Sequence, residues 1–172
     1  GAMQVHAFDS IETTCGQGTL MHEWERQGLE ADTILIAVGG GGLIAGSLAW
    51  LQERRKVVAV EPIKSSALAS ALEVGKPIDV DVSGIASNAL GAKKAGKICF
   101  ELAKEQGILA LTIKDEDIAL AQILLWNKLR QFVEPAAATA LAALTSGAYV
   151  PKENEKVAVL ICGGNPPSNP FD

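Results

Sequence analysis

The 172-residue sequence lacks an excess of positive charge, with 15 Lys and Arg against 20 Asp and Glu and a formal net charge of −5. Nucleic acids and anionic membranes are bound by clustered basic residues, so neither partner is expected. Cysteine is also scarce: Cys15, Cys99 and Cys162 are an odd number at wide spacings. This excludes a disulfide framework and a CxxC metal knuckle, and it favours a reducing, cytoplasmic location.

An uninterrupted membrane-spanning run is missing too. Residues 33–52 carry no charge, but four successive glycines lie in the middle of this stretch and interrupt any helix. What is present is the composition of a folded protein, with 48% apolar and 20% charged residues. Residues 1–3 read as an expression scar, and we expect one α/β domain over residues 4–172.

Short apolar runs alternate with helical patterns along the chain. The runs predict strands at residues 34–38, 57–60, 108–113 and 157–162. Helices are predicted at residues 43–55, 66–73, 93–106, 115–133 and 135–146. Strands separated by helices indicate an α/β fold with an open, mostly parallel sheet and helices on both faces.

The four glycines, Gly39, Gly40, Gly41 and Gly42, lie between a predicted buried strand and a helix start. Free backbone N–H groups and the helix dipole favour an anion at such a place, and glycine lets phosphate oxygens approach the amides closely. No Lys-Ser or Lys-Thr pair follows, which excludes a nucleoside-triphosphate P-loop. We therefore predict that residues 39–42, called the glycine loop below, bind the phosphate of a small molecule.

Two other interpretations of the glycine loop stay open at this point. One is a tight strand-to-helix turn without a ligand. The other is a Rossmann-type NAD-binding domain, because Gly40-x-Gly42-x-x-Ala45 has the dinucleotide spacing and Glu61 follows about 20 residues later. In that case Glu61 would bind a ribose hydroxyl.

The strand predicted at residues 157–162 also ends in glycines, Gly163 and Gly164. Ligands of open α/β sheets bind outside the carboxyl ends of the strands, so both glycine segments are expected to face one crevice. Cys162 would then be a hydrogen-bond partner for a ring heteroatom, or a buried core cysteine.

Several motifs occur together in order along the chain. They are His6-Ala7-Phe8-Asp9, Gly16-Gln17-Gly18-Thr19, Val38 to Gly46, Val60-Glu61-Pro62, Gly84-Ile85-Ala86, Leu90-Gly91-Ala92, Glu134-Pro135 and Cys162-Gly163-Gly164-Asn165. This series resembles the second half of the serine/threonine dehydratases, which are fold-type-II pyridoxal-phosphate enzymes related to tryptophan synthase β. The resemblance spans residues 6–165. It implies a lyase that converts threonine or serine into a 2-oxo acid and ammonia.

The resemblance also implies roles for individual residues. The glycine loop and the amide of Leu43 would hold the phosphate of pyridoxal 5'-phosphate, and Gly84 and Glu134 would line the pocket of its ring. Cys162 would face the pyridine nitrogen. Unlike a carboxylate, a thiol there does not hold the nitrogen protonated, which suits β-elimination.

A cation site is implied at Glu61, together with the backbone near Ser65 and Ala67. Ala67 stands where many members of the family have an acidic residue, and the loss of an oxygen ligand weakens a site for a hard cation.

The family's Schiff-base lysine lies in a Lys-x-Arg-Gly setting in the first half of its members, and no lysine of this sequence has that setting. The resemblance therefore implies the C-terminal portion of a dehydratase, inactive alone. Half of such a sheet would expose a strand edge and apolar helix faces. We expect a homo-oligomer or a partner that supplies the N-terminal half. The remaining alternative is a noncatalytic assembly module.

Overall fold

The computed structural model describes residues 5–166, so the predicted scar at residues 1–3 lies outside the described residues. Its four strands form one sheet in which every neighbouring pair is parallel. The order is β3-β2-β1-β4, with β1 at Thr33–Ala37, β2 at Lys56–Pro62, β3 at Leu109–Ile113 and β4 at Val157–Val159. All four predicted strands are therefore present, and the parallel α/β fold is confirmed.

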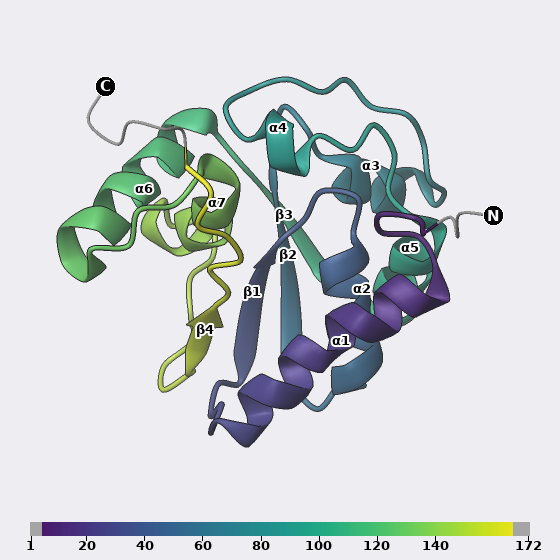
Figure 1. Ribbon diagram of the computed structural model, residues 1–172, viewed down its shortest axis with the longest axis horizontal. Helices are drawn as coiled ribbons and strands as arrows, with labels where there is room; N and C mark the ends of the chain where they lie inside the picture. The colour runs from purple at the N-terminus through teal and green to yellow at the C-terminus, as the bar shows by residue number, and fades with distance from the viewer. Residues whose placement is uncertain (1–4, 167–172) are drawn as a thin grey trace.

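Helices cover both faces of the sheet (Figure 1). One face carries α1 (Ile11–Arg26), α2 (Gly42–Leu51), α3 (Ala67–Val74) and α5 (Lys97–Glu105). The other carries α6 (Asp115–Leu129) and α7 (Pro135–Thr145), with the short α4 (Ser87–Leu90) beside α7. The sheet is thus the middle layer of three, as the sequence predicts.

Strand β1 lies in the interior of this sandwich, and all five of its residues are buried. Successive side chains of a strand point to opposite faces. Ile34 and Ile36 accordingly join the core beneath α1 and α2, whereas Leu35 and Ala37 join the core beneath α7. A run that is apolar throughout is what a strand covered on both faces requires.

Some element ends differ from the predictions. The helix predicted from residue 93 begins only at Lys97, after Gly96 as its N-cap. The helix predicted to reach residue 133 ends at Leu129, because Arg130 takes a left-handed conformation with φ of 55°. The last strand ends at Val159, although the amide of Leu160 still donates to the carbonyl of Leu35.

Helix α1 is not predicted from the sequence, because its two glycines and paired threonines are poor helix formers. Its first turn is capped by Ser10, whose hydroxyl accepts a hydrogen bond from the amide of Thr13 at 3.2 Å. Tertiary packing stabilises the rest. A Cβ added at Gly18 would lie 2.9 Å from the carbonyl oxygen of Gly46 in α2, so the two helix backbones are in direct contact.

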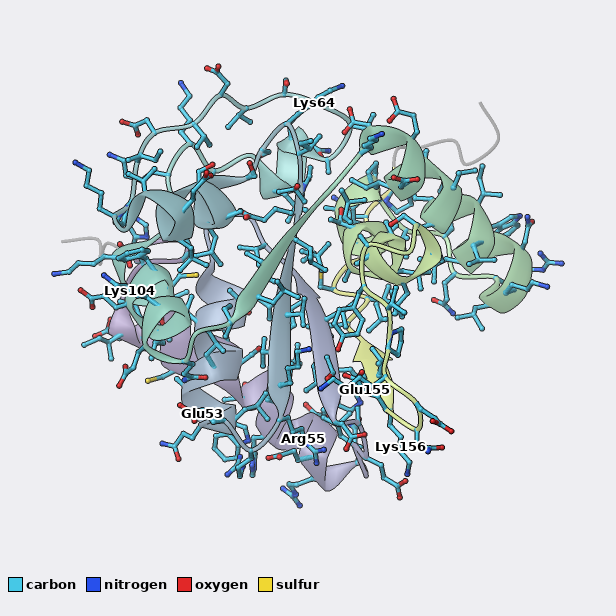
Figure 2. The ribbon with its side chains drawn as sticks, turned by 180° about the vertical axis from the view of Figure 1, so that it is seen from behind. Glu53, Arg55, Lys64, Lys104, Glu155 and Lys156 are labelled. Carbon is cyan, nitrogen blue, oxygen red and sulfur yellow. The ribbon has the colours of Figure 1, made fainter. Side chains whose placement is uncertain are left out.

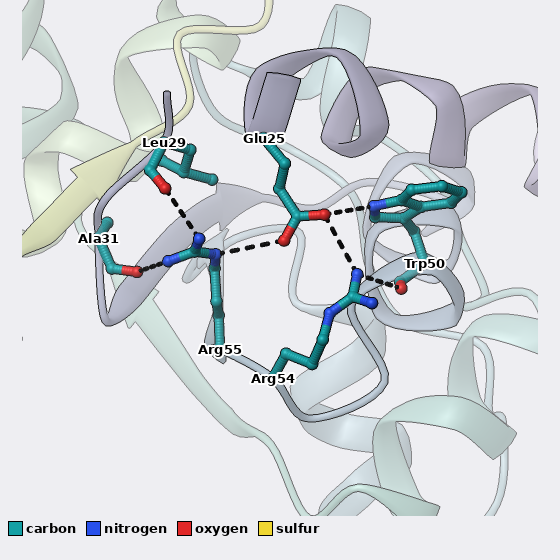
Figure 3. Close-up of polar contacts among 6 residues, drawn as sticks. All are labelled: Glu25, Leu29, Ala31, Trp50, Arg54 and Arg55. Atoms are coloured by element: carbon teal, nitrogen blue, oxygen red, sulfur yellow. Dashed lines mark hydrogen bonds and ion pairs between the residues drawn. The ribbon is translucent and has the colours of Figure 1, made fainter. Parts of the chain in front are cut away.

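A polar network fixes the carboxyl ends of α1 and α2 against each other (Figure 3). Glu25 of α1 accepts from the indole N–H of Trp50 at 2.8 Å and from Arg54 at 3.1 Å. Its other oxygen lies 3.5 Å from Nε of Arg55. Arg55 also donates to the backbone carbonyls of Leu29 and Ala31 in the segment that leads into β1. These contacts hold the carboxyl end of α1 against the segment that precedes β1.

A second polar cluster lies at the amino ends of the strands. Glu155 accepts hydrogen bonds from the hydroxyls of Thr33 and Tyr149, and Lys56 donates to the Tyr149 hydroxyl at 3.0 Å. Figure 2 shows Glu155 at the end of the sheet opposite to Lys64. These hydrogen bonds hold the pKa of the Glu155 carboxyl down at about 2.

In the described part of the chain, no helix combines the length and apolar character needed to cross a bilayer.

Candidate functional site

The glycine loop connects β1 to the N-terminus of α2. Gly41 is the N-cap of α2 and has a φ of 96°, a conformation that favours glycine. No side chain among the described residues caps this helix, and its first turn holds no acidic residue. The amides of the first turn are therefore available to an anion, and the helix dipole favours a negative charge there.

A cleft of about 400 Å³ opens over the glycine loop. Its volume lies within the range usual for small-molecule sites. Segments from both ends of the chain line it: Ala7, Phe8, Gln17, Ala37, Gly39, Gly40, Gly41, Gly42, Leu43, Ala89, Leu90, Glu134, Ala136 and Cys162. The cleft therefore brings together the glycine loop, Leu43, Glu134 and Cys162, all predicted from the sequence to share one site.

Glu134 and Cys162 are linked through the segment that follows β4. The Oε2 atom of Glu134 accepts a hydrogen bond from the amide of Asn165 at 2.7 Å. A Cβ added at Gly163 would overlap the Glu134 carboxylate, so any larger residue there would displace that side chain. Glu134 at the start of α7 therefore holds the Cys162 segment against the cleft.

Cys162 is exposed as a residue, yet the atoms around its sulfur raise the pKa of the thiol by desolvation. Its own backbone amide opposes this shift in pKa, and the Glu134 carboxylate adds to it. At neutral pH the side chain is consequently a neutral thiol, which is a weak hydrogen-bond donor.

Gly84 is not among the residues that line the cleft. It has a φ of 89°, and a Cβ on it would lie 2.8 Å from Oδ1 of Asp115. Oδ2 of Asp115 forms an ion pair with Lys64 at 2.8 Å. Gly84 thus packs against the start of α6, and its predicted place in a ring pocket stays a prediction.

Glu61 is completely buried and does not line the cleft. Its two oxygens accept hydrogen bonds from the amides of Leu68 and Ala69 at 2.8 and 2.7 Å, so it caps helix α3. Burial raises the pKa of this carboxyl to about 7, and the two amides partly oppose the shift. A residue so placed cannot reach a ribose, which removes the acid that the NAD-binding interpretation requires.

The cation site implied at Glu61, with the backbone near Ser65 and Ala67, stays a prediction. The Ser65 hydroxyl donates to the carbonyl of Leu90 at 2.7 Å, and Ala67 offers only its backbone oxygen to such a site. Among residues 5–166 there is no group of three or more His, Cys, Asp and Glu side chains that could hold a metal ion. A hard cation takes several oxygen ligands, and Glu61 is the one carboxylate of the predicted set.

Several cleft residues, among them Phe8 and Gln17, were not predicted to be site residues from the sequence. Phe8 precedes α1, and a Cβ on Gly40 would overlap its ring; Gln17 lies in α1 itself. The His6-Ala7-Phe8-Asp9 motif was the available signal for the first. None of the described residues that line the cleft is a lysine.

A parallel α/β sheet with a glycine loop at the start of a helix is typical of proteins that bind the phosphate group of a small ligand. Comparison with known families makes this specific. The chain belongs to the family described as pyridoxal-phosphate dependent enzymes, whose model matches residues 1–163. The cofactor of that family is pyridoxal 5'-phosphate.

The relatives include amino-acid dehydratases. The chain is 32% identical to a phenylserine dehydratase from Ralstonia pickettii, over 96% of this chain and 52% of that protein. It is 33% identical to a biosynthetic L-threonine dehydratase from Salmonella typhimurium, over 96% of this chain and 33% of that protein. The chain therefore spans from one third to about one half of these relatives.

The fold agrees with solved structures of the same group. The crystal structure of serine racemase from Dictyostelium discoideum matches with a TM-score of 0.84 and 30% identity, over 94% of this chain and 53% of that one. The predicted kinship with serine/threonine dehydratases and the fold-type-II architecture is confirmed.

Proposed function

We propose that this chain is the cofactor-binding portion of a threonine/serine ammonia-lyase, and that it is inactive alone. One observation carries the proposal: the cleft gathers the glycine loop, the uncapped start of α2 and the Cys162 thiol within about 400 Å³. These are an anion site and a neutral ring contact, the two features that pyridoxal phosphate requires.

In this proposal the amides of residues 39–43 hold the phosphate, and the helix dipole of α2 stabilises its charge. Cys162 contacts the ring nitrogen as a neutral thiol, while Glu134 keeps the Cys162 segment in place through the amide of Asn165. When bound, pyridoxal phosphate acts as an electron sink for the amino-acid substrate. The residues of this chain bind and orient it.

The lysine that binds the cofactor covalently would come from outside these 172 residues. Support comes from the lining of the cleft, where the described residues include no lysine, and from the coverage of the relatives, which are longer. The chain alone would therefore bind pyridoxal phosphate reversibly and would not release ammonia from threonine or serine.

The experiment is equilibrium dialysis of the 172-residue chain against pyridoxal phosphate, pyridoxal and NAD. Pyridoxal phosphate is expected to bind at least about tenfold more tightly than pyridoxal, because only it carries the anion. Inorganic phosphate should compete. Binding of NAD alone, or equal binding of pyridoxal, would reject the proposed site.

Borohydride reduction followed by peptide mass mapping tests the lysine. Surface lysines are expected to give scattered, substoichiometric adducts. A single lysine modified in one-to-one yield would show that the chain carries its own Schiff-base residue.

Association with another chain is the second part of the proposal. Helix α6 exposes large apolar side chains: Leu120 at 61%, Ile123 at 55% and Leu129 at 63% of their surface. Exposed apolar groups along one helix are typical of an interface. We expect a homo-oligomer, or a complex with a chain that supplies the missing half. Sedimentation velocity measures the oligomeric state of the unchanged chain and of Leu120→Lys. If the unchanged chain sediments as a monomer and Leu120→Lys sediments in the same way, the homo-oligomer is contradicted. If the chain binds no cofactor but oligomerises, the noncatalytic assembly module is the better interpretation.

A further inference from the structure

We propose that Asp9 is a positioning residue for the glycine loop, which it holds through the start of helix α5. This inference rests on the proposed phosphate-binding function of that loop. Asp9 does not line the cleft and is not itself a ligand-binding residue.

A hydrogen bond joins Asp9 to the start of α5. Oδ1 of Asp9 accepts from the backbone amide of Ile98, in the first turn of α5, at 3.0 Å. Helix α5 has no capping side chain of its own, because its N-cap is Gly96. A carboxylate supplied from 89 residues away in the sequence therefore caps this helix.

A second hydrogen bond connects the start of α5 to the glycine loop. The amide of Gly96 donates to the carbonyl oxygen of Gly40 at 3.0 Å. A Cβ on Gly96 would lie 3.1 Å from Cγ of Asp9, so the carboxylate packs directly on the N-cap. Asp9, Gly96 and Gly40 thus form a continuous chain of contacts from the segment before α1 to the middle of the glycine loop.

Packing on both sides completes the arrangement. The thiol of Cys99 in α5 lies against Gly41, and the ring of Phe8 lies against Gly40. Burial, with the charges of Glu61 and Asp9, raises the pKa of the Cys99 thiol to about 12, so it packs as a neutral group. Phe8 and Asp9 are neighbours in sequence. Phe8 contacts the glycine loop directly from the cleft side, whereas Asp9 acts on the loop through α5.

The turn that carries both residues is itself ordered. Nδ1 of His6 accepts from the amides of Phe8 and Asp9 at 3.2 and 2.8 Å, and Thr13 in α1 donates to the carbonyl of His6 at 2.8 Å. A preorganised loop binds an anion better than one that must be ordered by the ligand. Loss of the Asp9 carboxylate should therefore weaken phosphate binding without removing any group that contacts phosphate.

The test uses Asp9→Ala and Asp9→Asn, with Gly147→Ala as a destabilised control, because Gly147 has a φ of 78°, follows α7 and does not line the cleft. Asparagine keeps an acceptor for the Ile98 amide, and alanine does not. In equilibrium dialysis, Asp9→Ala is expected to weaken pyridoxal phosphate binding by at least about tenfold, whereas Asp9→Asn stays within about threefold of the unchanged chain.

Amide hydrogen exchange of the ligand-free chain gives an independent readout. Asp9→Ala should speed exchange at Gly96 and Ile98 more than Gly147→Ala does, and Asp9→Asn should restore slow exchange. If Asp9→Ala does not fold, Asp9→Glu, which moves the acceptor by one methylene, is expected to show both effects in weaker form.

The outcomes separate the two proposals. If the unchanged chain does not bind pyridoxal phosphate, the proposed function fails, and the exchange data alone decide whether Asp9 holds the loop. If it binds, but Asp9→Ala and Gly147→Ala are alike in affinity and exchange, the positioning role of Asp9 is wrong.

Discussion

Replacement of Gly41 by alanine is expected to destabilise the fold through two separable effects. The φ of 96° places the new residue in the left-handed region, which costs an L-residue roughly 1–2 kcal/mol. The new Cβ would also overlap the sulfur of Cys99 and approach its Cβ to 2.6 Å. Forced repacking of a filled core costs roughly 1–3 kcal/mol. The free energy of unfolding should therefore fall by about 2–5 kcal/mol in total.

Gly75→Ala is the matched control, because Gly75 has a φ of 84° but no heavy atom near the added Cβ. It should show only the backbone effect, roughly 1–2 kcal/mol. Urea unfolding followed by circular dichroism measures both variants. The double variant Gly41→Ala, Cys99→Ala should recover part of the additional loss of unfolding free energy that Gly41→Ala shows over Gly75→Ala, because the overlapping sulfur is gone. Equal losses for Gly41→Ala and Gly75→Ala would refute the packing argument.

Two further predictions concern the opposite end of the sheet and the helix crossing. The pKa of Glu155, about 2 when folded, lies below its ordinary value of 4.5. Its contribution is thus present above pH 4.5 and lost towards pH 2, so acid titration should destabilise the unchanged chain more steeply than Glu155→Gln. Parallel curves would contradict this. Gly46→Ala, with a Cβ 2.5 Å from the Gly18 amide nitrogen, should lower the melting temperature strongly, whereas Gly16→Ala in open space should not. Equal melting temperatures would show that α1 can move aside.

The glycine loop and β1 could be predicted from sequence because their signals are local. A fully apolar run predicts a strand buried on both faces, and Gly39 to Gly42 directly after it predict a turn into a helix with free amides. Cys162 and Glu134 lie far away in sequence, yet parallel strands end at one edge, and both line the same cleft.

The remainder depends on tertiary contacts that the sequence does not reveal. Helix α1 forms because Gly18 fits against Gly46, a contact that outweighs its poor helix propensity. The position of Glu61 after a strand allowed a ribose-binding role, whereas its burial and its hydrogen bonds to two backbone amides make it a cap for α3. The role of Asp9 involves a residue 89 positions away.

The short edge strand β4 has a consequence for ligand affinity. It pairs with β1 alone over three residues, and the segment that carries Cys162 follows it directly. If β4 docks in only a fraction of the molecules, only that fraction has a complete cleft. The measured dissociation constant for a ligand would then equal the intrinsic constant divided by that fraction. A substitution that tightens the docking of β4 should increase affinity while it leaves every group that contacts the ligand unchanged.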